Sequence, residues 1–151
     1  MFGKRPITMK SITIAGFLTI SLIAGYNIAV GGVVRFYSDW KAPKSAQKDP
    51  DPIPATAASV SAGHALFTQN CEACHGANGQ GDGPTGAFLS PHPANLTTAS
   101  FWKQGEGAIF WKITHGRSPM PSFRDSLTRK QRWDVINYIH QKFDPARRNK
   151  P

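Results

Sequence analysis

The sequence predicts an all-α protein, in which a small domain of helices follows a single transmembrane helix. In the domain, apolar residues recur at helical spacing, as in Ala108, Ile109 and Ile113, and no strand-like alternation stands out. A run of 24 residues from Ser11 to Val34 carries no charge, and as a helix it would span about 36 Å, enough to cross a bilayer. The domain is expected over residues 59–145.

The N-terminal segment predicts the topology. Lys4, Arg5 and Lys10 precede the apolar run, which places residues 1–10 in the cytoplasm and the domain on the other side of the membrane. We expect a single-pass anchor over residues 11–35 in a bacterial inner (cytoplasmic) membrane, with the domain in the periplasm. A cleaved signal peptide is the alternative, and it would export the domain equally well.

The composition changes on both sides of the domain. Four prolines, spread among Ala, Lys and Asp, predict a semi-extended linker over residues 36–58, with a loop packed on the domain as the alternative. Residues 146–151 form a basic tail. The whole chain has 18 Lys and Arg against 9 Asp and Glu. Because no nucleic-acid motif accompanies this charge, an acidic protein partner or an anionic membrane is favoured over nucleic acid.

The domain is expected to contain three main helices joined by irregular segments. In chain order these are a helix capped by Ser59 or Ser61, a Gly-rich irregular segment over 70–89, a helix over Gly105–His115 ended by Gly116, a loop over Ser118–Phe123, and a helix from Ser126 to about Lys142.

The only two cysteines lie in the run Cys71-Glu72-Ala73-Cys74-His75. This spacing is the attachment signature of c-type haem, in which each thiol adds to a vinyl group and the histidine becomes an axial iron ligand. A thioredoxin-like pair would be expected near a βαβ pattern, and none is present. A structural zinc site would need a second ligand pair, which the remaining histidines do not form.

Around this run, over about Ser59 to Phe143, the sequence resembles the class I c-type cytochromes. The resemblance is carried by Gly63 and Phe67 before the motif, Gly83-Pro84 after it, Met120-Pro121-x-Phe123, and Asp134 to Ile139 with Tyr138. It implies a small class I cytochrome c domain of helices around one haem c, attached at Cys71 and Cys74. It also implies that the Pro84 carbonyl accepts a hydrogen bond from His75, that Met120 is the sixth iron ligand, and that the last helix crosses the first near Gly63.

The residues themselves also favour Met120 as a ligand. It is the only methionine of the domain, and Pro119 and Pro121 stiffen its loop. A methionine that merely fills the core is the first alternative, and a bis-histidine site with His115 is the second. Trp102 and Trp111 are expected to pack around the haem or between helices, and a hydrogen bond from one of them to a haem propionate is the alternative.

The function expected from these features is electron transfer by a six-coordinate haem, and the chain is expected to be an electron carrier and not an enzyme. It would work either as a membrane-tethered carrier or as a subunit of a respiratory or photosynthetic electron-transfer complex. The loop Gly81 to Pro84 is similar to that of cytochrome c subunits of bacterial respiratory complexes, including alternative complex III. Expected partners are a donor protein and a terminal oxidase or reaction-centre type acceptor. Their acidic faces would dock against a basic rim of Arg117, Arg124, Arg129, Lys130 and Arg132. A haem enzyme or gas sensor with a labile sixth ligand is the alternative.

Overall fold

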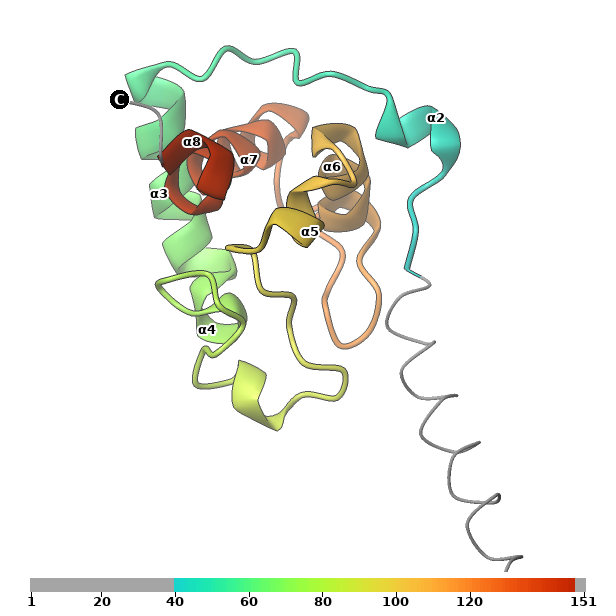
Figure 1. Ribbon diagram of the computed structural model, residues 1–151, viewed down its shortest axis with the longest axis vertical. Helices are drawn as coiled ribbons and strands as arrows, with labels where there is room; N and C mark the ends of the chain where they lie inside the picture. The colour runs from blue at the N-terminus through green and yellow to red at the C-terminus, as the bar shows by residue number, and fades with distance from the viewer. Residues whose placement is uncertain (1–39, 149–151) are drawn as a thin grey trace, which may run out of the picture. The chain divides into compact units, whose positions relative to one another are not determined.

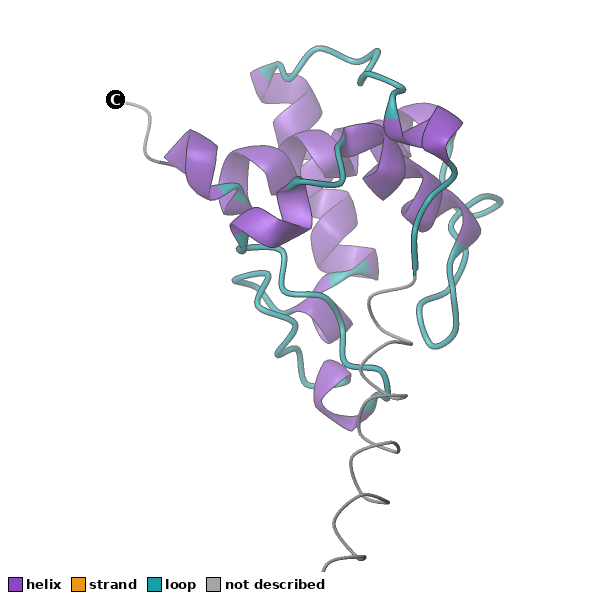
Figure 2. Ribbon diagram, turned by 45° about the vertical axis from the view of Figure 1, so that its right-hand side comes forward, coloured by secondary structure: helices purple, strands orange, loops and turns teal. Residues whose placement is uncertain are grey.

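The computed structural model describes residues 40–148 (Figure 1). In chain order the elements are α2 (Lys44–Gln47), α3 (Ala57–Asn70), α4 (Glu72–His75), the 3-10 helix η1 (Gly86–Phe88), α5 (Ala99–Trp102), α6 (Glu106–His115), α7 (Arg129–Phe143) and α8 (Pro145–Arg148). Within this part of the chain there is no strand, so the all-α expectation is confirmed there (Figure 2). None of these helices is long and apolar enough to cross a bilayer. The expected anchor over residues 11–35 lies outside the described residues.

Helices α3 and α7 cross in direct backbone contact at Gly63. A Cβ atom at this position would lie 1.9 Å from Asp134 O and 2.9 Å from Tyr138 Cβ, so only a hydrogen atom fits. The expected crossing of the first and last helices near Gly63 is therefore confirmed.

Helix α7 forms the centre of the core. Its residues 132–139 are all buried, because α3 packs on one side of the helix and α6 on another. Trp133 and Ile136 are fully buried, and Phe67 of α3 packs between Tyr138 and Phe143 with ring centroids 5.4 and 5.5 Å apart. Burying a phenylalanine of this kind stabilises the fold by about 2 kcal/mol.

Two helices begin at residues other than the expected caps, and both differences have a hydrogen-bonding cause. Helix α3 begins earlier, because the Thr56 side chain accepts a hydrogen bond from Ser59 N. Helix α7 begins later than Ser126, because Thr128 and Gln131 form a reciprocal capping box. The end of α6 at His115, followed by Gly116 with φ of 62°, is as expected.

The expectation of a semi-extended linker over residues 36–58 is wrong for its described part. Residues 40–56, hereafter the strap, pack along the domain, and residues 57–58 already belong to α3. Helix α2 of the strap lies on α6, where a Cβ at Gly107 would meet Ala46 O at 2.1 Å. Asn137 Nδ2 donates to Ile53 O over 3.0 Å, which holds the far end of the strap on α7.

A histidine and two carboxylates join α6 and α7. His140 Nδ1 contacts the Glu106 carboxylate, and His140 Nε2 lies 2.9 Å from Asp144 Oδ2. The His140 ring also stacks on Trp102 of α5, with centroids 4.8 Å apart. The hydrogen bond from His140 lowers the pKa of Glu106 below its ordinary value of 4.5. The ionised Glu106 carboxylate therefore stabilises this junction.

We predict that Gly63→Ala destabilises the fold by about 2 kcal/mol or more, because the added Cβ forces α3 away from α7. The loss should outweigh the helix-propensity gain of alanine over glycine, which is below about 1 kcal/mol. Urea unfolding of the holoprotein measures the change. Ser61→Ala, an exposed position on the same helix, is the matched control and should change stability little. Equal effects of the two variants would show that the crossing is not the tight contact described.

We predict that Glu106→Gln lowers the free energy of unfolding by about 1 kcal/mol at pH 7, because it removes a charge-assisted hydrogen bond. A carboxyl whose folded pKa is depressed contributes its stability above the unfolded value, here about 4.5, and loses it as the pH falls through the folded value. The difference between the variant and the parent should therefore shrink below pH 4.5. A pH series of unfolding midpoints measures this, and a difference that grows on acidification would contradict it.

Candidate haem-binding site

The two cysteines and His75 lie on one turn at the end of α3. Cys71 N donates to Phe67 O over 2.8 Å, so Cys71 ends α3, and it also begins α4. Cys74 N and His75 N both donate to Cys71 O, over 3.1 and 2.8 Å. The crossing of α3 with α7 therefore fixes where this turn begins relative to the core.

The chemistry of the cysteines fits covalent attachment better than the alternatives. Both thiols are free and half-buried. Burial and, second, the nearby Cys74 raise the pKa of Cys71 to about 12, so this thiol is not preset as a thiolate for redox exchange or zinc binding. Within residues 40–148, no three His, Cys, Asp or Glu side chains are grouped as a metal site requires.

The oxygen that faces His75 is that of Ala94, which corrects the expectation for Pro84. His75 Nδ1 lies 3.1 Å from Ala94 O, and because a carbonyl can only accept, Nδ1 carries the proton. The unprotonated Nε2 is then the nitrogen able to bind iron, and the second-sphere hydrogen bond orients the ring. Burial lowers the pKa of His75, which also favours the neutral, ligating form.

The Gly83–Pro84 segment instead packs against the other side of the attachment turn. Gly83 N donates to Cys74 O over 3.2 Å, and Thr85 N donates to Ala73 O over 2.9 Å. A Cβ at Gly83 would lie 2.4 Å from Ala73 O, which explains the glycine. This segment therefore supports the turn through backbone contacts and leaves the His75 ring to Ala94.

Met120 lies on a short, tightly hydrogen-bonded turn after α6. Arg117 and Met120 exchange two backbone hydrogen bonds of 2.9 Å each. Phe123 N donates to Ile113 O over 3.0 Å, and Ser122 Oγ donates to Thr114 O over 2.7 Å, which fasten the loop to the end of α6. Met120 is half-buried against the core. Its loop and α4 lie toward the same end of the domain, the lower end in Figures 1 and 2.

His115, the alternative ligand, is held on its own helix. Its Nδ1 lies 2.8 Å from Trp111 O, its ring stacks on Trp111 at 4.3 Å, and the residue is exposed. This arrangement favours Met120 over His115, and the ligation by Met120 stays a prediction.

Of the two tryptophans considered as propionate donors, Trp102 has a partner within the protein. Trp102 Nε1 donates to Leu96 O over 2.8 Å. Among the described residues, the buried tryptophan nitrogen without a partner is Trp133 Nε1. The Trp133 side chain is fully buried and stacks on Phe110 at 4.4 Å. A buried N–H normally has an acceptor, so the unpaired Trp133 Nε1 fits a domain whose core is completed by a haem, which carries propionate carboxylates.

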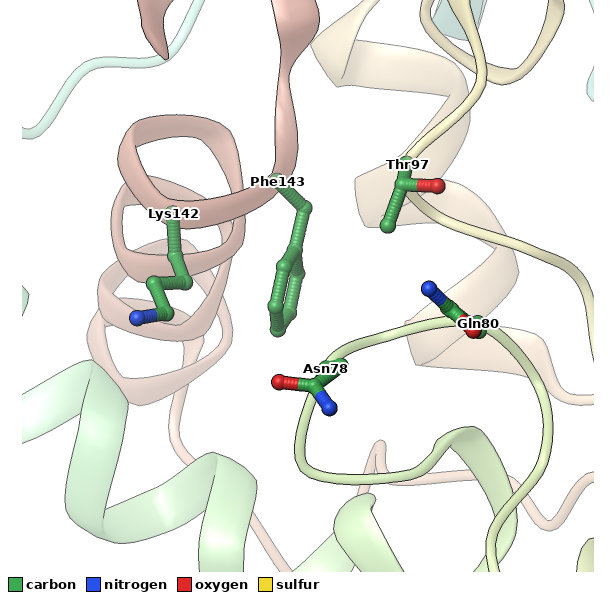
Figure 3. A pocket seen from close by; sticks show the side chains of 5 residues that line it. All are labelled: Asn78, Gln80, Thr97, Lys142 and Phe143. Carbon is green, nitrogen blue, oxygen red and sulfur yellow. The ribbon is translucent and has the colours of Figure 1, made fainter.

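A separate polar hollow of about 380 Å³ lies beside the end of α7 (Figure 3). It is lined by Asn78, Gln80, Thr97, Lys142 and Phe143. None of the predicted haem-binding residues lines this hollow, so it is distinct from the candidate haem-binding site.

Comparison with known proteins identifies the family of the chain. A family model described as cytochrome C oxidase, cbb3-type, subunit III matches residues 58–139, more than half of the chain. The chain belongs to this family of c-type cytochromes. Its domain therefore binds one covalently attached haem c and works in electron transfer.

Individual relatives are similar over the same region. The chain is 32% identical over 85 residues to cytochrome c6 of Thermosynechococcus vestitus, covering 56% of this chain and 71% of that protein. It is 33% identical over 101 residues to cytochrome c6 of a Picosynechococcus species, covering 64% and 82%. A chain of the reducing HAO-like protein complex of Kuenenia stuttgartiensis superposes with a TM-score of 0.52 at 28% identity. That match covers 58% of this chain and 45% of the other.

We predict that Cys71→Ala and Cys74→Ala each leave one thioether bond, so that the haem still migrates with the chain on a denaturing gel. One unsaturated vinyl group should shift the alkaline pyridine spectrum of the reduced haem to longer wavelength. The double variant should lose the haem to acidified acetone. A single variant with the parent's pyridine spectrum would show that its cysteine is not an attachment point.

Proposed function

We propose that the protein is a six-coordinate haem c electron carrier with His75 and Met120 as axial ligands, tethered to the periplasmic face of a bacterial inner membrane. The observation that carries this proposal is the fixed hydrogen-bonding of both ligand segments. His75 is oriented through Ala94 O, and Met120 sits in a turn closed by two backbone hydrogen bonds.

The chain's own residues suit fast transfer of single electrons. When bound, haem c supplies a one-electron ferric/ferrous couple whose potential depends on its axial ligands. The Arg117–Met120 turn and the Ala94 contact restrict movement of either ligand, which keeps reorganisation small. With both His75 and Met120 bound, the iron would have no open coordination site for a substrate.

We further propose that the haem domain acts next to its anchor, as a subunit of a respiratory complex. If the anchor ends at residue 35, only residues 36–39 remain before the strap, a reach of about 14 Å. A free linker over residues 36–58 would reach about 80 Å. The docked strap therefore favours a partner in the immediate vicinity over long-range shuttling. The match to a family described as an oxidase subunit supports the same choice.

The basic docking rim is smaller than the sequence suggests. Arg132 is buried, and its Nη1 donates to Phe123 O and Arg124 O. Lys130 pairs with Asp134 over 2.8 Å. Arg124 and Arg129 are exposed beside the Met120 loop, and we propose that they steer an acidic donor or acceptor toward it.

We predict that the ferric holoprotein is low-spin with a methionine-to-iron charge-transfer band, and that its ferrous form does not respond to carbon monoxide. Met120→Ala should abolish the band, open the sixth position to carbon monoxide and lower the potential, because the thioether ligand is lost. Visible spectra of both proteins, ferric and ferrous, with and without carbon monoxide, provide the measurement.

A parent protein that binds carbon monoxide readily would move the function to catalysis or gas sensing. His115→Ala is the matched control, because it removes the alternative ligand and should leave the charge-transfer band intact.

Co-purification of a stoichiometric partner in mild detergent is expected for a subunit of a complex. A chain that purifies alone would instead favour a tethered carrier that shuttles between partners.

A further inference from the structure

The strap begins with an aromatic contact to the helix and loop that carry Met120. The ring of Trp40 lies 5.2 Å from Lys112 Nζ and 5.0 Å from Arg117 Cζ. Both are cation–π distances. Burial and, second, the charge of Arg117 lower the pKa of Lys112. The indole therefore stabilises two neighbouring cations that otherwise repel each other.

Arg117 connects this contact to the predicted iron ligand. Its backbone N–H and C=O form both hydrogen bonds that close the turn with Met120. Displacement of Arg117 would therefore move the backbone of Met120 directly.

The rest of the strap holds Trp40 in place. Ala42 is buried, and its carbonyl accepts a hydrogen bond from Gln47 Nε2 over 2.7 Å. Helix α2 then packs against Gly107 of α6, with Asp49 O also within 2.5 Å of a Cβ built there. Trp40 thus belongs to a segment that is docked on the domain.

We propose that Trp40 is a positioning residue for the sixth iron ligand: through Arg117 it supports the backbone of the Met120 turn. The strap is then part of the ligand's support as well as a connection to the anchor. This inference rests on the proposed ligation by Met120.

Exogenous imidazole, which competes with the methionine for ferric iron, provides the test. In the full-length holoprotein, Trp40→Ala should raise the association constant for imidazole about fivefold, because loss of the cation–π contact would weaken the hold on the Met120 turn. Trp40→Phe keeps an aromatic face and should restore most of the parent's value. Lys41→Ala, an exposed neighbour in the strap, is the matched control and should have no effect.

A purely structural role would give a different result. Trp40→Ala would then lower the midpoint of helix melting while the imidazole constant stayed at the parent's value, and this outcome would overturn the proposal. If Met120 is not a ligand, the parent would already bind imidazole as tightly as Met120→Ala does. This result distinguishes a wrong ligand assignment from a wrong role for Trp40.

Gly107→Ala gives a second route that leaves Trp40 and Arg117 unchanged. Its Cβ would collide with Ala46 O and displace the strap from α6. We expect a rise in the imidazole constant similar to that of Trp40→Ala, and no further rise in the double variant, because both changes release the same brace. Full additivity, or no effect of Gly107→Ala, would overturn the proposal.

Discussion

The backbone contact between α3 and α7 at Gly63 is the constraint on which the haem site depends. Because no side chain separates the helices there, the direction of α3 is set by α7, and Cys71 follows directly at the end of α3. Phe67, one turn before Cys71, fills the space between Tyr138 and Phe143. The attachment turn is therefore an extension of the core, and its position does not depend on a flexible loop.

A buried polar network makes this crossing specific. Asp134 is almost completely buried, and its carboxylate accepts hydrogen bonds from Ser59 Oγ over 2.7 Å and from Lys130 Nζ. Asn137 donates to Ser59 Oγ and to Ile53 O, which links the crossing to the strap. These partners offset the cost of burying the Asp134 charge, whereas Asp51 Oδ2 is buried without a partner. Burial is also the main reason that the pKa of Asp51 is raised, so docking of the strap carries an electrostatic cost.

The features predicted correctly from the sequence are those encoded by short motifs. The end of α6 at Gly116 and the Gly63 crossing each depend on residue type at one position, and the Cys71–His75 run indicated the haem c that the family binds, while the roles of its individual residues stay predictions. The Ala94 contact could not be predicted in this way, because a backbone carbonyl has no residue-specific signal and lies 19 residues from His75. Prolines misled the interpretation of the strap. They indicate an extended backbone, and the contact that docks it, Asn137 with Ile53, joins residues 84 positions apart.

The two predicted ligands are supported by different parts of the domain. His75 is held by the end of α3 and by Ala94, whereas the Met120 turn is held by the end of α6, and α6 also carries the strap. The two supports meet at α7, which packs against both α3 and α6. Changes in α7 should therefore disturb both ligands together, whereas changes at Trp40 act on the methionine side. A thioether binds iron more weakly than a tethered imidazole. The strap therefore supports the weaker of the two predicted ligands, Met120.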